Sequence, residues 1–373
     1  MKPLRVVFAI VSDCHASSGH YRALWQRHFY DGLRGAVSRL IIPVDVSFDW
    51  SRGGAGVEAA DSAAPGAATS QKLWEQIETA HHQHGLDAVI SYCYSRELDP
   101  RLVKDTIQFG VPWINFYCDS IHRFSEVANL AGLVSLNWFP ERAALPKYRA
   151  LNVRAACLPY ALNPDELPDL TCRQARRQVV FVGLPTTNRI TQLGLLRLWG
   201  CRVDVRGHGW IGAGDDPFYS AISRRQRLWN ALVSGGLTEK VMRRLVWPLV
   251  RRQAGGSLDD TEYFDFLRES QVVLGLNQSR DERGRFNSYL KLRDLEFPGY
   301  GCCYLTEHNE DVAAALEAGT EVLTYQSLPE AAAHLRALRR NPERARRVGA
   351  RGRARVLTRH TWRVRLLQLA EAL

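Results

Sequence analysis

The chain has no long hydrophobic run: nowhere do about eighteen apolar residues follow one another, so its 373 residues predict no membrane-spanning helix. We expect no cleavable leader either, because the apolar start that ends at Val11 runs into Ser12-Asp13-Cys14-His15 without a small-residue cleavage site. A buried first strand is the favoured interpretation. The eight cysteines contain no Cys-x-x-Cys pair, which indicates reduced core residues in a cytoplasmic protein.

The usual patterns of metal and nucleic-acid sites are missing as well. There is no Asp-x-Asp pair and no histidine cluster at metal-ligand spacing, so we expect no metal. The formal net charge of +10 suits nucleic acid, anionic lipid or a phosphorylated substrate. However, the arginine-rich stretches 222–253 and 336–365 carry no helix-turn-helix, zinc-finger or RNA-recognition motif. We therefore expect no nucleic-acid partner, and solvated helix faces explain most of the second stretch.

What is present describes a globular α/β protein. A hydrophobic share of 46% with 24% charged residues is typical of a folded chain, and 373 residues are enough for two domains. Short apolar runs alternate with helical patterns, as in βαβ units around a parallel sheet. In the first half, strands are expected at Arg5–Val11, Leu40–Val46, Asp87–Tyr92, Trp113–Tyr117, Leu133–Asn137 and Ala156–Pro159.

Helices are expected at Tyr21–Leu33 and Gln71–His84, and the aperiodic Gly/Ala/Ser-rich stretch Arg52–Ser70 is expected to be a mobile loop. The second half restarts with a strand at Gln178–Gly183, followed by a helix near Asn188. A helical tail runs from Pro329, with a further helix start at Asn341-Pro342-Glu343. The remaining elements of this half are expected at Arg202–Arg206, Thr261–Glu269, Val272–Leu276, Cys302–Leu305 and Val322–Tyr325.

The stretch from Lys291 to Glu307 carries the most information about function. A charged helical turn with Arg293 and Glu296 runs into a Pro-Gly-Tyr-Gly break and a short apolar strand. This order places a cation and a carboxylate at the crevice where α/β domains hold nucleotides. With the later Glu321–Tyr325 and His-Thr-Trp motifs, residues 179–373 resemble the C-terminal half of GT-B glycosyltransferases, especially the spore-maturation (CgeB-like) group. That group shows the patterns R-x-x-E-x-x-x-x-G, E-[IV]-x-x-Y and H-T-[YW].

The resemblance implies an α/β fold of the GT-B type. In this fold two Rossmann-like domains with parallel sheets face each other across an interdomain cleft, and a C-terminal helix crosses back. The parts expected here are an N-terminal acceptor domain (1–161), a linker (162–177), a nucleotide-sugar-binding domain (178–355) and a terminal helix (356–373) packed on the first domain.

A glycine-containing turn after the first strand of the second half is expected to bind the donor diphosphate. The strand, small-residue loop and helix start from Phe181 to Arg189 leave backbone N–H groups at the crevice, around Gly183 and Asn188. Arg189 adds a cation that can bind phosphate with two hydrogen bonds. The related glycosyltransferases carry a similar Gly…Asn-Arg element at this place, although many such turns bind nothing.

The next strand leads into a second turn, which resembles the family's Gly-x-Gly-Trp element. Gly207 and Gly209 permit a close backbone approach there. His208 and Trp210 are candidates to line a base or sugar pocket, and a packed tryptophan is the alternative.

Related retaining enzymes flank the donor with two glutamates separated by seven residues, of which the second holds the ribose. Here Glu296 matches the second, but Ser288 stands at the first, which puts the sugar-facing role and the stereochemical class in doubt. Arg293 lies one helical turn before Glu296 and is expected on the same side. Asn277 and Lys291 are further donor-binding candidates. A surface Arg–Glu pair on a helix is the alternative.

An inverting transferase needs a general base beside the acceptor hydroxyl. Asp13, His15 and His20 follow the first strand and are candidate catalytic residues, with helix capping as the alternative for Asp13. Asp119, after the fourth expected strand, is a further candidate that could instead orient His122.

Residues 223–252 alternate arginines with apolar residues at helical spacing. Such a helix could lie on an anionic membrane surface and reach a lipid-linked acceptor, or pack its apolar side on the domain. Both interpretations stay open.

The resemblance implies a glycosyltransferase that moves a sugar from a nucleotide-diphosphate sugar to a hydroxyl of a glycan or lipid-linked acceptor. We expect a role in cell-envelope polysaccharide, glycolipid or secondary glycan synthesis, in the cytoplasm or at the inner face of the membrane, with no cofactor besides the co-substrate. The alternatives are a sugar-nucleotide epimerase or phosphorylase on the same fold, and a non-catalytic nucleotide-binding protein. The missing first glutamate slightly favours the last.

Overall fold

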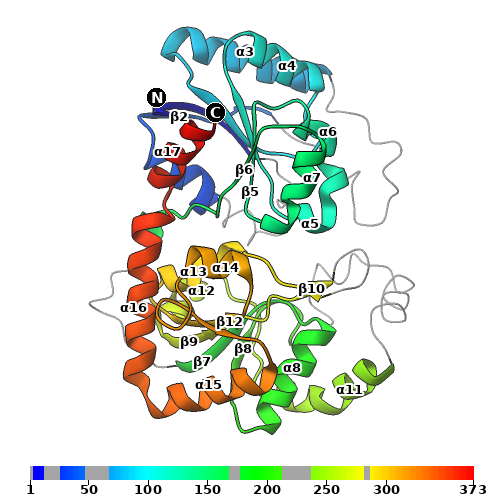
Figure 1. Cartoon of the computed structure of the whole chain (residues 1–373), viewed down its shortest axis with the longest axis vertical. Coiled ribbons are helices and arrows are strands. Elements are labelled where there is room, and N and C mark those ends of the chain that lie inside the picture. Colours follow the sequence, from blue (N-terminus) through cyan, green and yellow to red (C-terminus); the bar gives the residue numbers. More distant parts are fainter. Residues whose placement is uncertain (1–2, 12–25, 47–66, 168–176, 212–236, 281–285) are drawn as a thin grey trace. The chain divides into compact units, whose positions relative to one another are not determined.

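The computed structural model describes residues 3–11, 26–46, 67–167, 177–211, 237–280 and 286–373 (Figure 1). These residues form two compact units, each built around one parallel sheet, so the α/β two-domain fold expected from the sequence is confirmed. Unit 1 comprises Met1–Glu166, Ser279–Leu292 and Leu357–Leu373. Unit 2 comprises Leu167–Gln278 and Arg293–Val356. The segment Ser279–Leu292, which the sequence placed inside the second domain, thus belongs to unit 1.

The sheet of unit 1 has six parallel strands in the order β2-β1-β3-β4-β5-β6. The central strands β3, β4 and β5 are buried at every position, as expected for strands covered on both faces. The residues that follow β4 and β5 lie at one edge, because these two strands are adjacent and parallel. The bounds are β1 Val6–Val11, β2 Arg39–Ile41, β3 Ala88–Tyr92, β4 Trp113–Phe116, β5 Leu136–Phe139 and β6 Ala155–Cys157.

Short helices connect these strands. Helix α4 shows why they begin where they do: the Asp99 carboxylate accepts a 2.8 Å hydrogen bond from the Arg101 N–H, and Pro100 occupies the first position. The α-helices in the described part of unit 1 are α2 Gly32–Arg34, α3 Ala67–His84, α4 Pro100–Gln108, α5 Ser120–Arg123, α6 Ala128–Ala131, α7 Leu145–Ala150 and α17 Trp362–Ala372. A π-helical turn lies at Gln26–Asp31, and 3-10 turns lie at Phe124–Glu126, Arg142–Ala144 and Pro164–Glu166.

The terminal helix α17 packs on unit 1 through Trp362, which is only 2% exposed. The Trp362 indole donates a hydrogen bond to the carbonyl of His28. Its ring centroid lies 5.0 Å from that of Phe29 and 5.5 Å from that of Trp138 in edge-to-face contacts. One tryptophan therefore joins the end of the chain to the start of unit 1 and to β5.

The sheet of unit 2 has five parallel strands in the order β13-β12-β9-β7-β8. Strand β8 lies on one side of β7 and β9 on the other. The connection from β7 to β8 and the connection from β8 to β9 therefore run in opposite directions along the sheet. In open α/β sheets, ligands bind outside the carboxyl ends of the strands at such a switch point. The bounds are β7 Arg177–Val182, β8 Asp204–Arg206, β9 Ser270–Leu274, β12 Cys303–Glu307 and β13 Leu323–Tyr325. The antiparallel pair β10 Ser279–Arg280 and β11 Phe286–Asn287 falls in unit 1.

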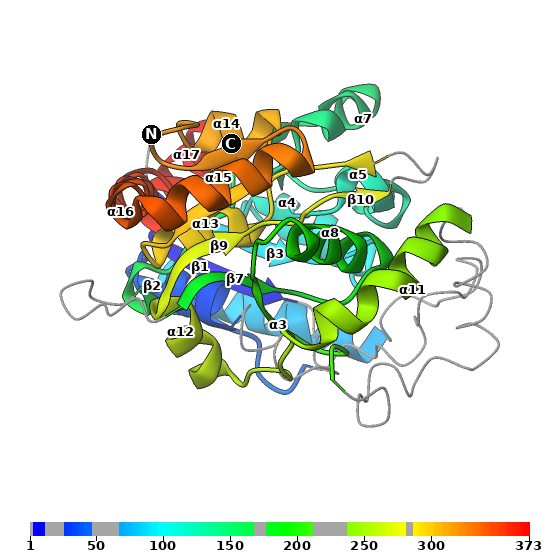
Figure 2. The same ribbon diagram turned by 90° about the horizontal axis from the view of Figure 1, so that it is seen from below.

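Helices pack around the sheet of unit 2, and α11 lies alongside α8 (Figure 2). The two helices meet at Gly194, where an added Cβ would lie 2.3 Å from the Cβ of Val246. A glycine in the middle of α8 therefore permits this close approach. The bounds are α8 Thr187–Leu198, α11 Leu237–Arg251, α12 Asp260–Arg268, α13 Leu292–Gly299, α14 Glu310–Ala315, α15 Leu328–Arg340 and α16 Pro342–Arg359.

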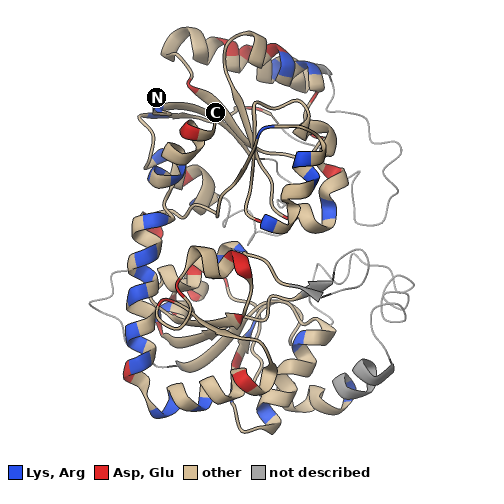
Figure 3. Cartoon of the chain, in the orientation of Figure 1, with Lys and Arg blue, Asp and Glu red and all other residues tan. Residues whose placement is uncertain are grey.

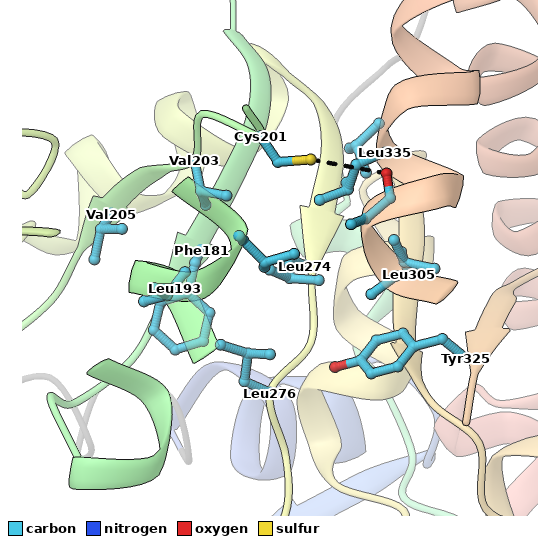
Figure 4. Packing of buried hydrophobic residues seen from close by; sticks show 14 of the residues in the cluster. Phe181, Leu193, Cys201, Val203, Val205, Leu274, Leu276, Leu305, Tyr325 and Leu335 are labelled. Carbon is cyan, nitrogen blue, oxygen red and sulfur yellow. Dashed lines mark hydrogen bonds between the residues drawn. The ribbon is translucent and has the colours of Figure 1, made fainter. Parts of the chain in front are cut away.

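The core of unit 2 joins β7, β8, β9, β12 and β13 to α8 and α15 (Figure 4). Phe181, Leu193 and Leu305 are each no more than 1% exposed. Within this core the Cys201 thiol donates a 3.7 Å hydrogen bond to the carbonyl of Ala332. Six cysteines in the described parts of the chain are free thiols, so the expectation of reduced cysteines is confirmed there.

Several expected elements differ from the structure in their bounds, and the differences at β2, β5 and α3 are the largest among the fully described ones. Strand β2 ends at Ile41 and not at Val46, because Pro43 has no N–H to continue the sheet. Strand β5 is Leu136–Phe139 and not Leu133–Asn137, since the N–H groups of Leu133 and Val134 close the turn after α6 on the carbonyl of Leu130. Helix α3 begins at Ala67, so the last four residues of the expected loop are helical. The rest of that loop up to residue 66 lies outside the described residues.

Candidate functional site

Arg189 spans the switch point of the unit 2 sheet. It lies in the first turn of α8, and its Nε donates a 3.0 Å hydrogen bond to the carbonyl of Leu276, just beyond the end of β9. Its Nη1 donates a 3.1 Å hydrogen bond to the carbonyl of Leu184 in the β7–α8 loop. The guanidinium carbon lies 5.5 Å from the ring centroid of Phe181. A half-buried cation therefore joins the ends of β7 and β9 at the place where the sequence predicts the diphosphate.

The two glycine turns that the sequence singles out lie against each other. Gly207 has a φ of 137°, and a Cβ at this position would lie 2.4 Å from the carbonyl oxygen of Gly183. The same carbonyl accepts a 2.6 Å hydrogen bond from the indole of Trp210, which is 1% exposed and belongs to the core. Trp210 is thus a packed residue, the alternative that the sequence left open. His208 is half-buried, with its Nδ1 2.8 Å from the hydroxyl of Ser257.

Glu296 is a buried carboxylate, 3% exposed, and not part of a surface Arg–Glu pair. It accepts a 2.9 Å hydrogen bond from the hydroxyl of Tyr263 on α12. Burial and the neighbouring Glu296 raise the pKa of Tyr263 well above its usual value, while the charge of Arg293 opposes this shift. That Arg293 and Glu296 share one side of α13 stays a prediction.

Asn277 stands at the end of a buried polar network. Its side-chain nitrogen donates to Asp294 Oδ1 at 2.6 Å and to the hydroxyl of Tyr304 at 2.8 Å. Its backbone N–H donates to Glu307 Oε2 at 2.8 Å, and burial raises the pKa of that carboxyl. Asn277 is only 1% exposed, and its hydrogen bonds fix the backbone beyond β9. The carbonyl of the preceding residue, Leu276, accepts the hydrogen bond from Arg189. Its direct contact with a donor stays a prediction.

A second cluster lies in unit 1, where β4 and β5 end. The hydroxyl of Tyr289 donates a 2.7 Å hydrogen bond to Asp119 Oδ1. Glu141, which follows β5, accepts hydrogen bonds from the N–H groups of Asp119 at 2.5 Å and Ser120 at 3.0 Å. Burial of the Glu141 side chain and the charge of Asp119 raise the pKa of Glu141 to about 8, and the charge of Lys291 opposes the shift. Two carboxyl groups, a phenol and an ammonium group therefore share this edge.

Lys291 falls in unit 1, whereas the sequence grouped it with the residues of the second domain. Its Nζ lies 3.8 Å from the ring centroid of Tyr289, which is a cation–π contact. The His122 ring lies 5.4 Å from the same tyrosine ring. The Asp119 carboxylate pairs with Tyr289, and the Asp119 carbonyl accepts the His122 N–H at 3.0 Å.

The sequence identified Asp119 and Lys291 in this cluster but missed Glu141 and Tyr289. A usable signal existed for Glu141, because it follows the strand adjacent to that of Asp119 and therefore lies at the same edge. No local pattern marks Tyr289, whose partner is 170 positions away.

Asp13, His15 and His20 lie outside the described residues, as does the stretch 223–236 of the expected amphipathic helix. In the described part of that helix, α11, Val246 and Val250 pack into the core while Leu245 is 66% exposed. Packing is therefore observed for the buried face of α11, and membrane contact stays a proposal.

The arginines of α16 recur along its length and are mostly exposed to solvent (Figure 3). Arg346 pairs with Glu343 at 2.9 Å and Arg355 with Glu321 at 2.9 Å. Within the described ranges no helix is long and apolar enough to cross a membrane. The same residues contain no group of three His, Cys, Asp or Glu side chains that could hold a metal ion, and metal independence stays a prediction.

Comparison with known proteins gives a family-model match over part of the chain and several solved structures of similar fold. A family model described as glycosyl transferase-like matches residues 217–371, which include α13 with Arg293 and Glu296. No curated protein matches the chain.

Several solved structures are similar over nearly their whole length. A sucrose-phosphate synthase from Thermosynechococcus elongatus matches with 13% identity over 98% of both chains and a TM-score of 0.56. A glycosyltransferase from Rickettsia africae ESF-5 matches with 8% identity over 98% of this chain and 97% of its own, with a TM-score of 0.58. HepE from Anabaena, crystallised with UDP and glucose, matches with 12% identity over 99% and 98%, with a TM-score of 0.53. At these identities the likeness shows the fold, which is the two-domain α/β fold of GT-B glycosyltransferases.

Proposed function

We propose that this chain, with its GT-B fold and its glycosyl transferase-like segment, transfers a sugar from a nucleotide-diphosphate sugar to an acceptor hydroxyl. The observation that carries the proposal is the position of Arg189 across the switch point between β7 and β9. This is where open α/β sheets bind their ligands, and the first turn of a helix adds a dipole that favours an anion.

The donor's diphosphate would lie against the Gly183 turn and Arg189. Gly207 permits the close approach of the Gly183 turn, because a larger residue at position 207 would collide with the carbonyl of Gly183. For the leaving diphosphate to bind, Arg189 would exchange at least one of its two carbonyl acceptors for a phosphate oxygen. Stabilising the departing diphosphate in this way is the main catalytic contribution that the proposal assigns to unit 2.

Glu296 would accept the ribose hydroxyls, with its carboxylate direction fixed by the Tyr263 hydroxyl. Arg293, on the same helix, would add a second cation near the donor. These assignments follow the R-x-x-E pattern of the family resemblance.

Asp119 is the described residue that best suits a general base for the acceptor hydroxyl. Its carboxylate is half-buried and already accepts one hydrogen bond from Tyr289, which leaves further acceptor positions on the carboxylate. Lys291 lies over the ring of Tyr289, the hydrogen-bond partner of Asp119, and supplies a positive charge in the same unit. Asp13, His15 and His20 stay as sequence-based candidates for the same role.

A membership of the spore-maturation (CgeB-like) group, and a role in envelope polysaccharide or glycolipid synthesis at a membrane surface, are the finer parts of the proposal. They rest on the R-x-x-E, E-x-x-x-Y and H-T-W motifs and on the exposed Leu245 and arginines of α11.

The test is a thermal-shift screen of the full chain against UDP, GDP, ADP, CMP and their common sugar conjugates. We expect one nucleoside diphosphate and its sugar conjugate to raise the melting temperature selectively. Glu296→Gln should lose most of this shift, while Glu310→Gln, which changes an exposed glutamate of the same unit, should keep it. No stabilisation by any member of the panel would contradict the proposal.

Product analysis separates the alternatives. Conversion of the donor sugar to an epimer without any acceptor would indicate an epimerase. Binding without slow donor hydrolysis or transfer to any acceptor of a glycan panel would indicate a non-catalytic nucleotide-binding protein.

A further inference from the structure

Asp119 has a backbone conformation that needs support. Its φ of 79° and ψ of 19° are left-handed, a region that residues with a Cβ rarely occupy without compensation. It stands at the N-cap position of α5, but its side chain makes no capping hydrogen bond. The carboxylate is therefore not used to start the helix, and it is directed to the Tyr289 hydroxyl instead.

Glu141 provides the support. One of its oxygens accepts both consecutive N–H groups of the turn, those of Asp119 and Ser120. The Glu141 side chain is 0% exposed, so these hydrogen bonds are shielded from water. Its position is fixed in turn by the parallel pairing of β4 with β5, which brings the two strand ends side by side.

The other contacts of the turn hold Ser120 in place. The Ser120 hydroxyl lies 2.9 Å from the Tyr148 hydroxyl, and its carbonyl accepts a 3.0 Å hydrogen bond from Lys147 Nζ. Glu141 is therefore the one side chain in the described part of the chain that binds the Asp119 N–H itself.

We infer that Glu141 is a positioning residue: by binding two consecutive backbone N–H groups, it holds Asp119 in its left-handed conformation and sets the direction of its carboxylate. The consequence for catalysis rests on the proposed function, in which Asp119 is the general base. Glu141 itself does not touch the substrate and transfers no proton in this account.

Two variants of similar size isolate the acceptor oxygen. In Glu141→Gln the amide oxygen can still accept both N–H groups, whereas Glu141→Met has a similar length and no comparable acceptor. Both avoid the cavity that alanine would leave. Asp119→Asn completes the set, because asparagine tolerates the left-handed region and retains an acceptor for Tyr289 while losing the basic carboxylate.

The kinetic experiment follows the hydrolysis of UDP-glucose, or of whichever donor in the panel stabilises the chain most. We expect Glu141→Met to lower kcat by about 100-fold with the nucleoside diphosphate Kd unchanged, since a small displacement of a catalytic group costs this much. Glu141→Gln should restore kcat to within about threefold of the wild type, and Asp119→Asn should lose activity as Glu141→Met does. Equal losses in the Gln and Met variants would overturn the inference, as would a Met variant with wild-type kcat.

The second readout does not depend on activity. Amide hydrogen exchange of the peptide that contains Asp119 and Ser120 should be slow in the wild type and Glu141→Gln, and about 10-fold or more faster in Glu141→Met. Unchanged exchange in Glu141→Met would show that Glu141 does not hold the turn. If no donor binds or reacts, the proposed function fails, and this measurement still decides the role of Glu141.

Discussion

The hydroxyl of Tyr289 donates a 2.7 Å hydrogen bond to the carboxylate of Asp119, although the two residues are 170 positions apart. Asp119 follows β4, and Tyr289 lies in the segment Ser279–Leu292, whose sequence neighbours on both sides belong to unit 2. The contact therefore joins this inserted segment to the carboxyl edge of the unit 1 sheet, and it brings Lys291 to the same edge.

Removing the Tyr289 hydroxyl should weaken unit 1. We expect Tyr289→Phe to lower the free energy of unfolding by about 1.5–3 kcal/mol, the range for hydrogen bonds to charged groups. Urea unfolding of the single and double variants with Asp119→Ala gives the coupling between the two side chains. The cost of the left-handed backbone cancels in this cycle because it enters both alanine branches. A coupling energy near zero would mean that the hydrogen bond adds nothing.

Stability should depend on pH through Glu141. The pKa of its carboxyl is raised from 4.5 to about 8 in the folded chain, so between these values the folded state binds more protons than the unfolded state. This contribution is fully present below about pH 4.5 and is lost as the pH rises through about 8. The charged groups that face Glu141 are Asp119 and Lys291, while the neighbouring Tyr148 has a raised pKa and stays neutral.

Glu141→Gln removes this titration, so its stability relative to the wild type should improve from pH 5 to about pH 8 and then level off. Urea midpoints of both proteins across this range provide the measurement. Parallel curves for the two proteins would show that Glu141 does not titrate with a raised pKa.

Gly207 should tolerate no side chain. Gly207→Ala places a Cβ 2.4 Å from the carbonyl oxygen of Gly183 at a φ of 137°, so we expect a loss of about 2–4 kcal/mol and weaker nucleotide binding. Gly200→Ala is the matched control, because Gly200 also has a positive φ, of 80°, but has nothing within 4 Å of the added Cβ. It should cost about 1 kcal/mol and leave nucleotide affinity unchanged. If the two variants changed the nucleotide affinity equally, the Gly183 turn would have no specific role in donor binding.

The stability of the contact between α8 and α11 should depend on the combined size of the side chains at positions 194 and 246. Gly194→Ala overlaps the Val246 side chain, so it should destabilise unit 2 by about 1–3 kcal/mol. Adding Val246→Ala makes room for the new methyl group, and the double variant should be more stable than the sum of the single variants predicts. Simple additivity in thermal unfolding would argue against this packing.

Local chemistry made several features predictable. The helix start at Asn341-Pro342-Glu343 is confirmed, since α16 begins at Pro342 and the Arg344 N–H donates to the Asn341 side chain at 3.0 Å. Strand β1 at Val6–Val11 lies within the expected strand Arg5–Val11, and its four central apolar residues are buried. Such features depend on a few neighbouring residues, which the sequence displays directly.

Long-range pairings could not be predicted in the same way. Asp119 was identified from its place after a strand, but the Tyr289 hydroxyl and the Glu141 oxygen that hold it come from distant segments. Lys291 and Arg293 are both donor-binding candidates in the sequence, yet they fall in different units. The burial of Trp210 was an open alternative, since a Gly-x-Gly-Trp turn does not reveal which side of the tryptophan meets the core.

The central claim is that a donor diphosphate binds at Arg189, and isothermal titration with the stabilising nucleoside diphosphate tests it most directly. We predict that Arg189→Ala weakens binding by about 10- to 100-fold, the loss of one or two charge-assisted hydrogen bonds. Arg197→Ala, which removes an exposed arginine from the last turn of the same helix, should bind as the wild type does. Equal affinities for the wild type and a folded Arg189→Ala variant would contradict the account.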